Sequence, residues 1–114
     1  MFQNCRYIKS LNVEKFDTSK VDDMSGMFYG CYSLRILDIS HFNTKKVVDM
    51  SNMFYYCNSL MQIDFSNFDT SNVLDMSNMF GYMQYLLEAD LSMFNTSHVK
   101  NMSKMLIIVK NYLH

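Results

Sequence analysis

Cysteine, aspartate and histidine are the side chains of this chain whose types and spacing could support chemistry. The three cysteines, Cys5, Cys31 and Cys57, stand 26 residues apart from one to the next. Structural zinc sites need ligands in close pairs, typically about two to four residues apart, so this spacing does not predict a metal site. Met83 and Val109 occupy the next two positions of the series. We therefore expect buried thiols that behave as small apolar side chains.

Three aspartates, Asp38, Asp64 and Asp90, form a second series at the same spacing. If their segments are neighbouring strands about 4.8 Å apart, like charges are brought close together. Such a row could bind a hard cation or a basic partner. The alternative is a solvated row in which the serine two residues on, such as Ser40, hydrogen-bonds the carboxylate. We favour the alternative, because Ca²⁺ takes roughly six to eight oxygen ligands and the sequence offers no glycine-turned loop.

The three histidines give no support for catalysis. His41, His98 and His114 fall at different positions of the 26-residue period. Neither a serine nor a cysteine accompanies them in the order of a catalytic triad, so we expect no catalytic residues and no cofactor.

Composition limits the remaining classes of function. The chain has 114 residues, of which 49% are hydrophobic and 15% aromatic, enough to bury the core of one domain. Its net charge of −1 gives no electrostatic case for binding nucleic acid or an anionic membrane. No signal-peptide segment is visible at the start, and the longest apolar run, Met105–Val109, is too short to cross a bilayer. These features predict a cytoplasmic protein if the chain is complete.

A 26-residue repeat explains why these series share one spacing. The hexapeptide Asp-Met-Ser-Asn-Met-Phe stands at 49–54 and again at 75–80, with a variant at 23–28. Three further columns keep one residue type through four units. They are Phe16, Phe42, Phe68 and Phe94; Met24, Met50, Met76 and Met102; and Ser25, Ser51, Ser77 and Ser103. We read the chain 1–114 as a single repeat domain, with units at 1–26, 27–52, 53–78 and 79–104 and a partial unit at 105–114.

The pattern inside one unit predicts a short strand, a turn and a short helix. Residues 37–40 alternate apolar and polar, as a half-buried strand does. Asn43-Thr44 is a turn signal. Ser51 is then placed to cap a helix whose apolar face carries Met53, Phe54, Cys57 and Leu60. Neither element is stable alone, so units must stack, and we expect an α/β repeat solenoid with the repeated columns as structural ladders.

The repeat resembles a known family. The pattern L-x-x-L-x-L-x-x-F, followed by V-x-D-M-S-x-M-F-x-x-C-x-S-L, is similar to the 26-residue repeat of bacterial surface proteins, the BspA-like group of leucine-rich-repeat proteins. The resemblance covers nearly the whole chain. It implies an open leucine-rich-repeat-like stack of about four units, displayed on the cell surface or secreted as part of a longer protein. It also implies adhesion and protein binding, with no catalytic residues to carry over.

Columns that vary between units are free for partner binding. One set flanks the strand and comprises Lys15, His41 and Asn67, beside the aspartates Asp38, Asp64 and Asp90. A second set consists of tyrosines on the predicted helix, namely Tyr29, Tyr55, Tyr56, Tyr82 and Tyr85, with Tyr32 nearby. Tyrosine is amphipathic and common in interfaces. The alternative is that these rings only cover the space between helices.

Two functional classes follow from the sequence. The first is a non-enzymatic, adhesin-like module that binds a protein or a component of a host or matrix surface. The second is an intracellular scaffold, or a truncated fragment without an independent role. Both ends of the chain fall inside a unit and lack polar caps, which favours a slice of a longer array. The competing reading is that Met105–Val109 folds over the last unit as a cap.

Overall fold

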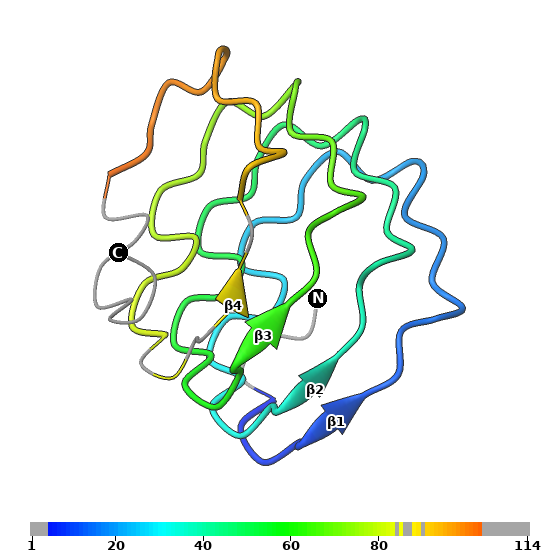
Figure 1. Cartoon of the computed structure of the whole chain (residues 1–114), viewed down its shortest axis with the longest axis vertical. Coiled ribbons are helices and arrows are strands. Elements are labelled where there is room, and N and C mark those ends of the chain that lie inside the picture. Colours follow the sequence, from blue (N-terminus) through cyan, green and yellow to red (C-terminus); the bar gives the residue numbers. More distant parts are fainter. Residues whose placement is uncertain (1–4, 84, 86–87, 90, 104–114) are drawn as a thin grey trace.

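The regular strands of the protein are very short. The computed structural model describes residues 5–83, 85, 88–89 and 91–103. Within them it contains four two-residue strands, β1 (Ser10–Leu11), β2 (Ile36–Leu37), β3 (Gln62–Ile63) and β4 (Glu88–Ala89) (Figure 1). The strands form two parallel pairs, β1 with β2 and β3 with β4, and every pairing joins residues 26 apart. The repeat period therefore sets the register.

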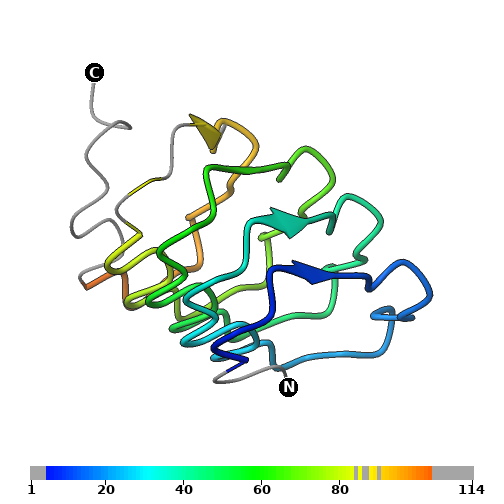
Figure 2. The same cartoon turned by 90° about the horizontal axis from the view of Figure 1, so that it is seen from below.

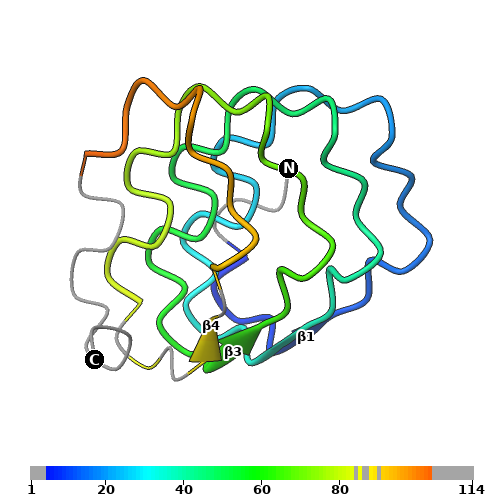
Figure 3. The same ribbon diagram turned by 45° about the horizontal axis from the view of Figure 1, so that its top comes forward.

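Each unit of the sequence makes one coil, and the coils stack side by side. Figures 1 and 2 show successive turns of the chain running in the same direction. In Figure 3 the bends of successive turns lie in a row along the top of the view. Parallel bridges join Asp23 to Asp49, Asp49 to Asp75, and Asp75 to Asn101. Equivalent residues of neighbouring units thus lie next to one another along the stack.

The predicted fold class, an α/β repeat solenoid with a short helix in each unit, is wrong. No helix occurs in the part of the chain that the structure describes. Where the helix was expected, N–H groups alternate between two kinds of partner. The amides of Met53, Tyr55 and Cys57 bond the carbonyls three residues earlier, at 3.0–3.3 Å. The amides between them, those of Phe54 and Tyr56, bond the carbonyls of Met79 and Gly81 in the next coil, each at 3.0 Å.

Left-handed backbone explains why no helix forms. Asn52 and Tyr56 have φ of 57° and 64°, and their equivalents one unit on, Asn78 and Tyr82, have 56° and 59°. Asn52 is the third residue of the four-residue turn that the hydrogen bond from Met53 to Met50 closes. A positive φ at the third residue is typical of such a turn and cannot continue a right-handed helix. The segment is a series of linked turns. Ser51 is accordingly not a helix cap: its N–H and hydroxyl both donate to the carboxylate of Asp49, at 2.9 and 2.7 Å.

Apolar side chains from successive coils fill the centre of the stack. The rings of Phe28, Phe54 and Phe80 stack nearly parallel, with centroids 5.5 and 6.0 Å apart. Met24, Met50 and Met76 are at most 2% exposed, while Met102 in the last described coil is 48% exposed. The phenylalanine column is also less buried at its ends than in its middle, and its first member is the most exposed. Phe16 is 38% exposed, Phe42 and Phe68 are buried, and Phe94 is half-buried.

A buried threonine column links the coils at one corner. Thr44 is 1% exposed, and its hydroxyl donates to the carbonyl of Asp69 at 3.0 Å and accepts from the N–H of the same residue at 2.8 Å. Thr18 forms the same pair of bonds with Asn43, and Thr70 forms it with Asn95. A side chain therefore takes the place of a backbone bridge where the chain bends.

In the described residues, no helix is long and apolar enough to span a bilayer.

Candidate functional site

The strand aspartates serve local turns. The Oδ1 atom of Asp38 accepts from the N–H and the hydroxyl of Ser40 at 3.0 and 2.6 Å, and that of Asp64 accepts from the N–H of Ser66 at 2.9 Å. These hydrogen bonds hold the pKa of both carboxyl groups below its usual value. Asp90 lies outside the described residues. Among those described, no group of three or more histidine, cysteine, aspartate or glutamate side chains could hold a metal ion.

The other predicted residues beside the strands connect neighbouring coils. His41 places its Nε2 atom 2.8 Å from the carbonyl oxygen of Val13, and the side-chain amide of Asn67 donates to the carbonyl of Ser40 at 2.7 Å. Lys15 is exposed beside a shallow hollow that it lines with Phe16. The geometry gives His41 and Asn67 a part in the stack, and leaves Lys15 as the exposed charge of this set.

The predicted tyrosines, apart from Tyr85, gather on one side of the stack. Five half-buried rings, which we call the tyrosine cluster, contact one another in a continuous set. Its members are Tyr29, Tyr32, Tyr55, Tyr56 and Tyr82. Tyr56 and Tyr82 stack at 4.8 Å and 14°, and Tyr29 and Tyr55 stack at 5.3 Å and 22°. Tyr55 meets Tyr56 edge to face at 4.6 Å and so joins the two pairs. Partial burial and the neighbouring phenols Tyr56 and Tyr82 raise the pKa of Tyr55.

Two rings of the cluster stand on left-handed backbone. Tyr56 and Tyr82 have φ of 64° and 59°, whereas the second unit has Gly30 at this position, with φ of 74°. A bulky residue in this region costs roughly 1–2 kcal/mol relative to ordinary backbone, a cost that glycine does not carry. Ring stacking offsets it by about 0.5–1.5 kcal/mol for each pair. Strained positions of this kind tend to lie at functional sites.

A glycine makes room for one of the rings. Gly81 stands one unit after Tyr55, and a Cβ atom there would lie 2.5 Å from two carbons of the Tyr55 ring. Any larger residue would push that ring away from the place where it meets Tyr82. Sequence reasoning missed this role, although the replacement of a repeated tyrosine by glycine at this position was visible.

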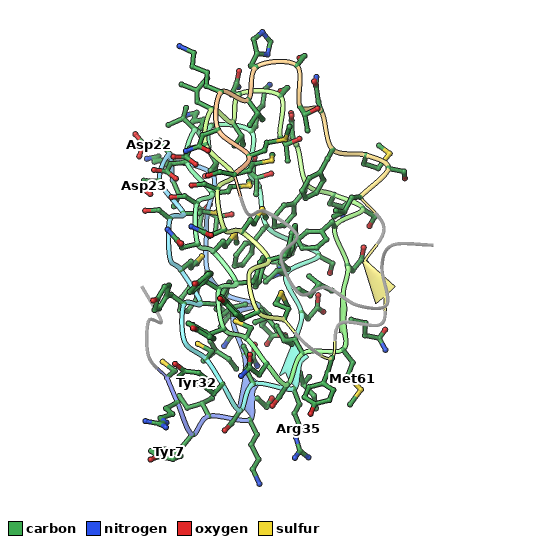
Figure 4. All side chains as sticks on the ribbon, turned by 90° about the vertical axis from the view of Figure 1, so that its left-hand side faces the viewer. Tyr7, Asp22, Asp23, Tyr32, Arg35 and Met61 are labelled. Atoms are coloured by element: carbon green, nitrogen blue, oxygen red, sulfur yellow. The ribbon has the colours of Figure 1, made fainter. Side chains whose placement is uncertain are left out.

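Aspartates accompany the tyrosines on the same segments. The stretches 21–34, 47–60 and 73–83 contain four carboxylates, Asp22, Asp23, Asp49 and Asp75, and no lysine, arginine or histidine. Figure 4 shows Asp22 and Asp23 on the same side of the molecule as Tyr32, farther along the coil. A hydrogen bond from Ser25 lowers the pKa of Asp23, which keeps that carboxylate charged.

One cation reaches the cluster from a neighbouring coil. The guanidinium carbon of Arg6 lies 5.3 Å from the ring centroid of Tyr32 and 6.0 Å from that of Tyr7, within the range of a cation–π contact. Lys100 stands in the last described coil, at the position that Asp22 occupies in the first. The sequence analysis does not single out Arg6, although Tyr32 stands one repeat period after it.

The predicted cysteine column is buried at two of its three members. Cys5, Cys31 and Cys57 are thiols, and the last two are at most 1% exposed. Burial raises the pKa of Cys31 to about 11 and raises the pKa of Cys57 as well, so neither is a thiolate at neutral pH.

A shallow hollow of about 360 Å³ lies elsewhere on the surface. Arg35 and Met61, labelled in the lower part of Figure 4, line it with Ser59 and Tyr85.

Comparisons with known proteins assign the chain to a family. Neither the curated protein sequences nor the solved structures contain a match. The model of one family, described as "Mycoplasma protein of unknown function, DUF285", matches residues 1–113. This family is associated with BspA-like repeats, the resemblance that the 26-residue motif carries. The chain therefore belongs to the DUF285 family of Mycoplasma proteins.

Proposed function

We propose that this chain is a non-enzymatic interaction module that binds a protein or another component of a cell surface. The observation that carries the proposal is the tyrosine cluster, in which five half-buried rings form one connected set. Tyrosine is favoured in interfaces because each ring offers a large apolar face and a hydroxyl group at a small entropy cost.

The rigidity of the supporting backbone favours the same function. The amides of Phe54 and Tyr56 donate to the carbonyls of Met79 and Gly81 in the next coil, each at 3.0 Å. The rings thus stand on segments that are hydrogen-bonded to the next coil. Binding a partner would therefore cost little conformational entropy for ordering these segments.

We extend the proposal to an adhesin-like role on the outside of a cell, within a longer protein. Support comes from the resemblance of the repeat to bacterial surface-protein repeats. The tyrosine cluster supplies the contact surface that such a role requires.

A double substitution of the strained tyrosines tests the proposal. Tyr56→Gly with Tyr82→Gly removes two rings and leaves the residue type that the second unit already has at this position, Gly30. The purified variant and the unchanged protein would be compared for binding to surfaces coated with a solubilised extracellular-matrix preparation. Circular dichroism and thermal melting would verify that the variant is folded. We expect the unchanged protein to bind and the double variant to lose about tenfold in affinity or more.

Tyr85→Ser is the matched control, because Tyr85 is 58% exposed and lies outside the cluster. Its binding should equal that of the unchanged protein. The proposal is wrong if the unchanged protein does not bind the matrix preparation, or if the folded double variant binds it as well as the unchanged protein does.

A further inference from the structure

We propose that the tyrosine cluster and the aspartates of the same segments bind an arginine-rich segment of a partner polypeptide. This inference rests on the proposed function and adds the chemistry of the partner. Three observations carry it: a guanidinium already seated on one ring of the cluster, the charge of the segments that bear the rings, and the fixed orientation of their carboxylates.

The contact of Arg6 shows how the cluster receives a cation. Its guanidinium lies over Tyr32 at 5.3 Å, where the negative face of the aromatic ring attracts positive charge. Tyr32 in turn meets Tyr56 at 5.8 Å, and Tyr56 stacks on Tyr82 at 4.8 Å. The aromatic set therefore continues past the place that Arg6 occupies, and the exposed part of each half-buried ring remains for further guanidinium groups to contact.

Charge complementarity selects a basic partner. The three segments that carry the cluster hold four carboxylates and no cationic side chain, in a chain with 10 basic and 11 acidic residues overall. Cations stand at the borders of these segments, at Lys20, Arg35 and Lys46, so the excess of negative charge is confined to the segments themselves. Arginine suits both parts of the surface, because its planar guanidinium stacks on aromatic rings and pairs with carboxylates.

The carboxylates are held in place by their own serines. The Oδ1 atom of Asp49 accepts two hydrogen bonds from Ser51, at 2.9 and 2.7 Å, and that of Asp75 accepts two from Ser77, at 2.8 and 2.7 Å. Both aspartates are half-buried and joined by a parallel bridge. A partner would meet a fixed row of acids on the segments that carry the rings.

Titration with hexa-arginine tests the inference on the full chain. Binding would be measured by isothermal titration calorimetry at low ionic strength, with hexa-glutamate as the peptide of opposite charge. We expect hexa-arginine to bind and hexa-glutamate not to bind. The Tyr56→Gly/Tyr82→Gly variant should bind hexa-arginine about tenfold more weakly, because two cation–π partners are lost.

Two pairs of charge substitutions separate the proposed surface from general attraction. Asp49→Asn with Asp75→Asn keeps the side-chain oxygen of the turn, as Asn101 does in the last described coil, and removes two charges. Asp38→Asn with Asp64→Asn removes two charges beside the strands, where Asn12 already forms the same turn. The first pair should weaken hexa-arginine binding by about fivefold, and the second should leave it nearly unchanged.

The outcomes distinguish this inference from the proposed function. It is overturned if hexa-arginine does not bind, or if the Asp38/Asp64 variant weakens binding as much as the Asp49/Asp75 variant. If the protein binds the matrix preparation through its tyrosines and ignores hexa-arginine, the proposed function stands and this inference fails. If hexa-arginine binds at the cluster and the matrix preparation does not, the adhesive function fails and the arginine surface remains.

Discussion

At the scale of single residues, the threonine column does the work of a backbone bridge. Thr44 satisfies both the N–H and the C=O of Asp69 from a position that is 1% exposed. Valine has nearly the same shape and can do neither. The repeat of threonine every 26 residues is visible in the sequence, but its partner is not, because the hydrogen bonds run to the turn residue of the next coil.

Thr44→Val should lower the free energy of unfolding by about 2–3 kcal/mol, because two backbone groups of Asp69 lose their partner in a part-buried corner. Urea denaturation monitored by circular dichroism measures the loss. Thr96→Val is the matched control at an exposed position of the same column and should change stability by less than about 0.5 kcal/mol. Equal losses in the two variants would show that the threonine bonds do not hold the stack.

At the scale of elements, the sequence predicts which side chains are buried but not the backbone that buries them. Met53, Phe54, Cys57 and Leu60 are all 0% exposed, as an apolar helical face would be. Their spacing fits a helix and a series of linked turns equally well. The deciding signal is the preceding column of Gly26, Asn52 and Asn78, since glycine and asparagine tolerate the positive φ that all three adopt.

Substitutions at Asn52 distinguish turns from a helix by the sign of their effect. In the observed turn, Asn52→Ala should destabilise the protein by about 1 kcal/mol, because alanine tolerates a φ of 57° poorly. Asn52→Gly should change stability by less than about 0.5 kcal/mol, since Gly26 fills the same position in the first unit. In a helix, alanine would be the most stable of the three residues and glycine the least. Urea midpoints of the three proteins decide between the two orders.

At the scale of the whole molecule, the stack depends on many aspartate turns of one kind. Five of the carboxylates have a pKa below the usual value, and in each the largest cause is a hydrogen bond from the serine two residues on. They are Asp17, Asp23, Asp38, Asp64 and Asp69. Because the same kind of hydrogen bond lowers each of these pKa values, the contributions of the five turns to stability should be lost over the same range of pH.

The fold should therefore be sensitive to acid. A carboxyl group whose folded pKa is lowered contributes stability that is fully present above its unfolded pKa, here 3.8, and is lost as the pH falls through the folded value. Urea midpoints should stay level from neutral pH down to about 5 and fall steadily below about 4. The Asp38→Asn/Asp64→Asn variant should show a shallower fall. A midpoint that stays level or rises down to about pH 3 would contradict this account of the turns.

The 26-residue period and the tyrosine columns follow from the sequence, because repetition alone reveals which residues become neighbours. The contacts of the site depend on more. The contact of Arg6 with Tyr32 joins residues one period apart and was open to the same reasoning. The edge-to-face packing of Tyr55 with Tyr82 does not join equivalent positions, and it needs the space left by Gly81. Such contacts appear only once the backbone path of a unit is known, and that path was the part mistaken for a helix.

Hydrogen-bond scalar couplings measured by NMR on isotope-labelled protein test the central claim most directly, since they identify the acceptor of each amide. The account predicts couplings from the amides of Asn52, Phe54 and Tyr56 to the carbonyls of Ser77, Met79 and Gly81, each 25 residues away. Couplings from those amides to carbonyls four residues earlier would reveal a helix in each unit and contradict the stack of helix-free coils.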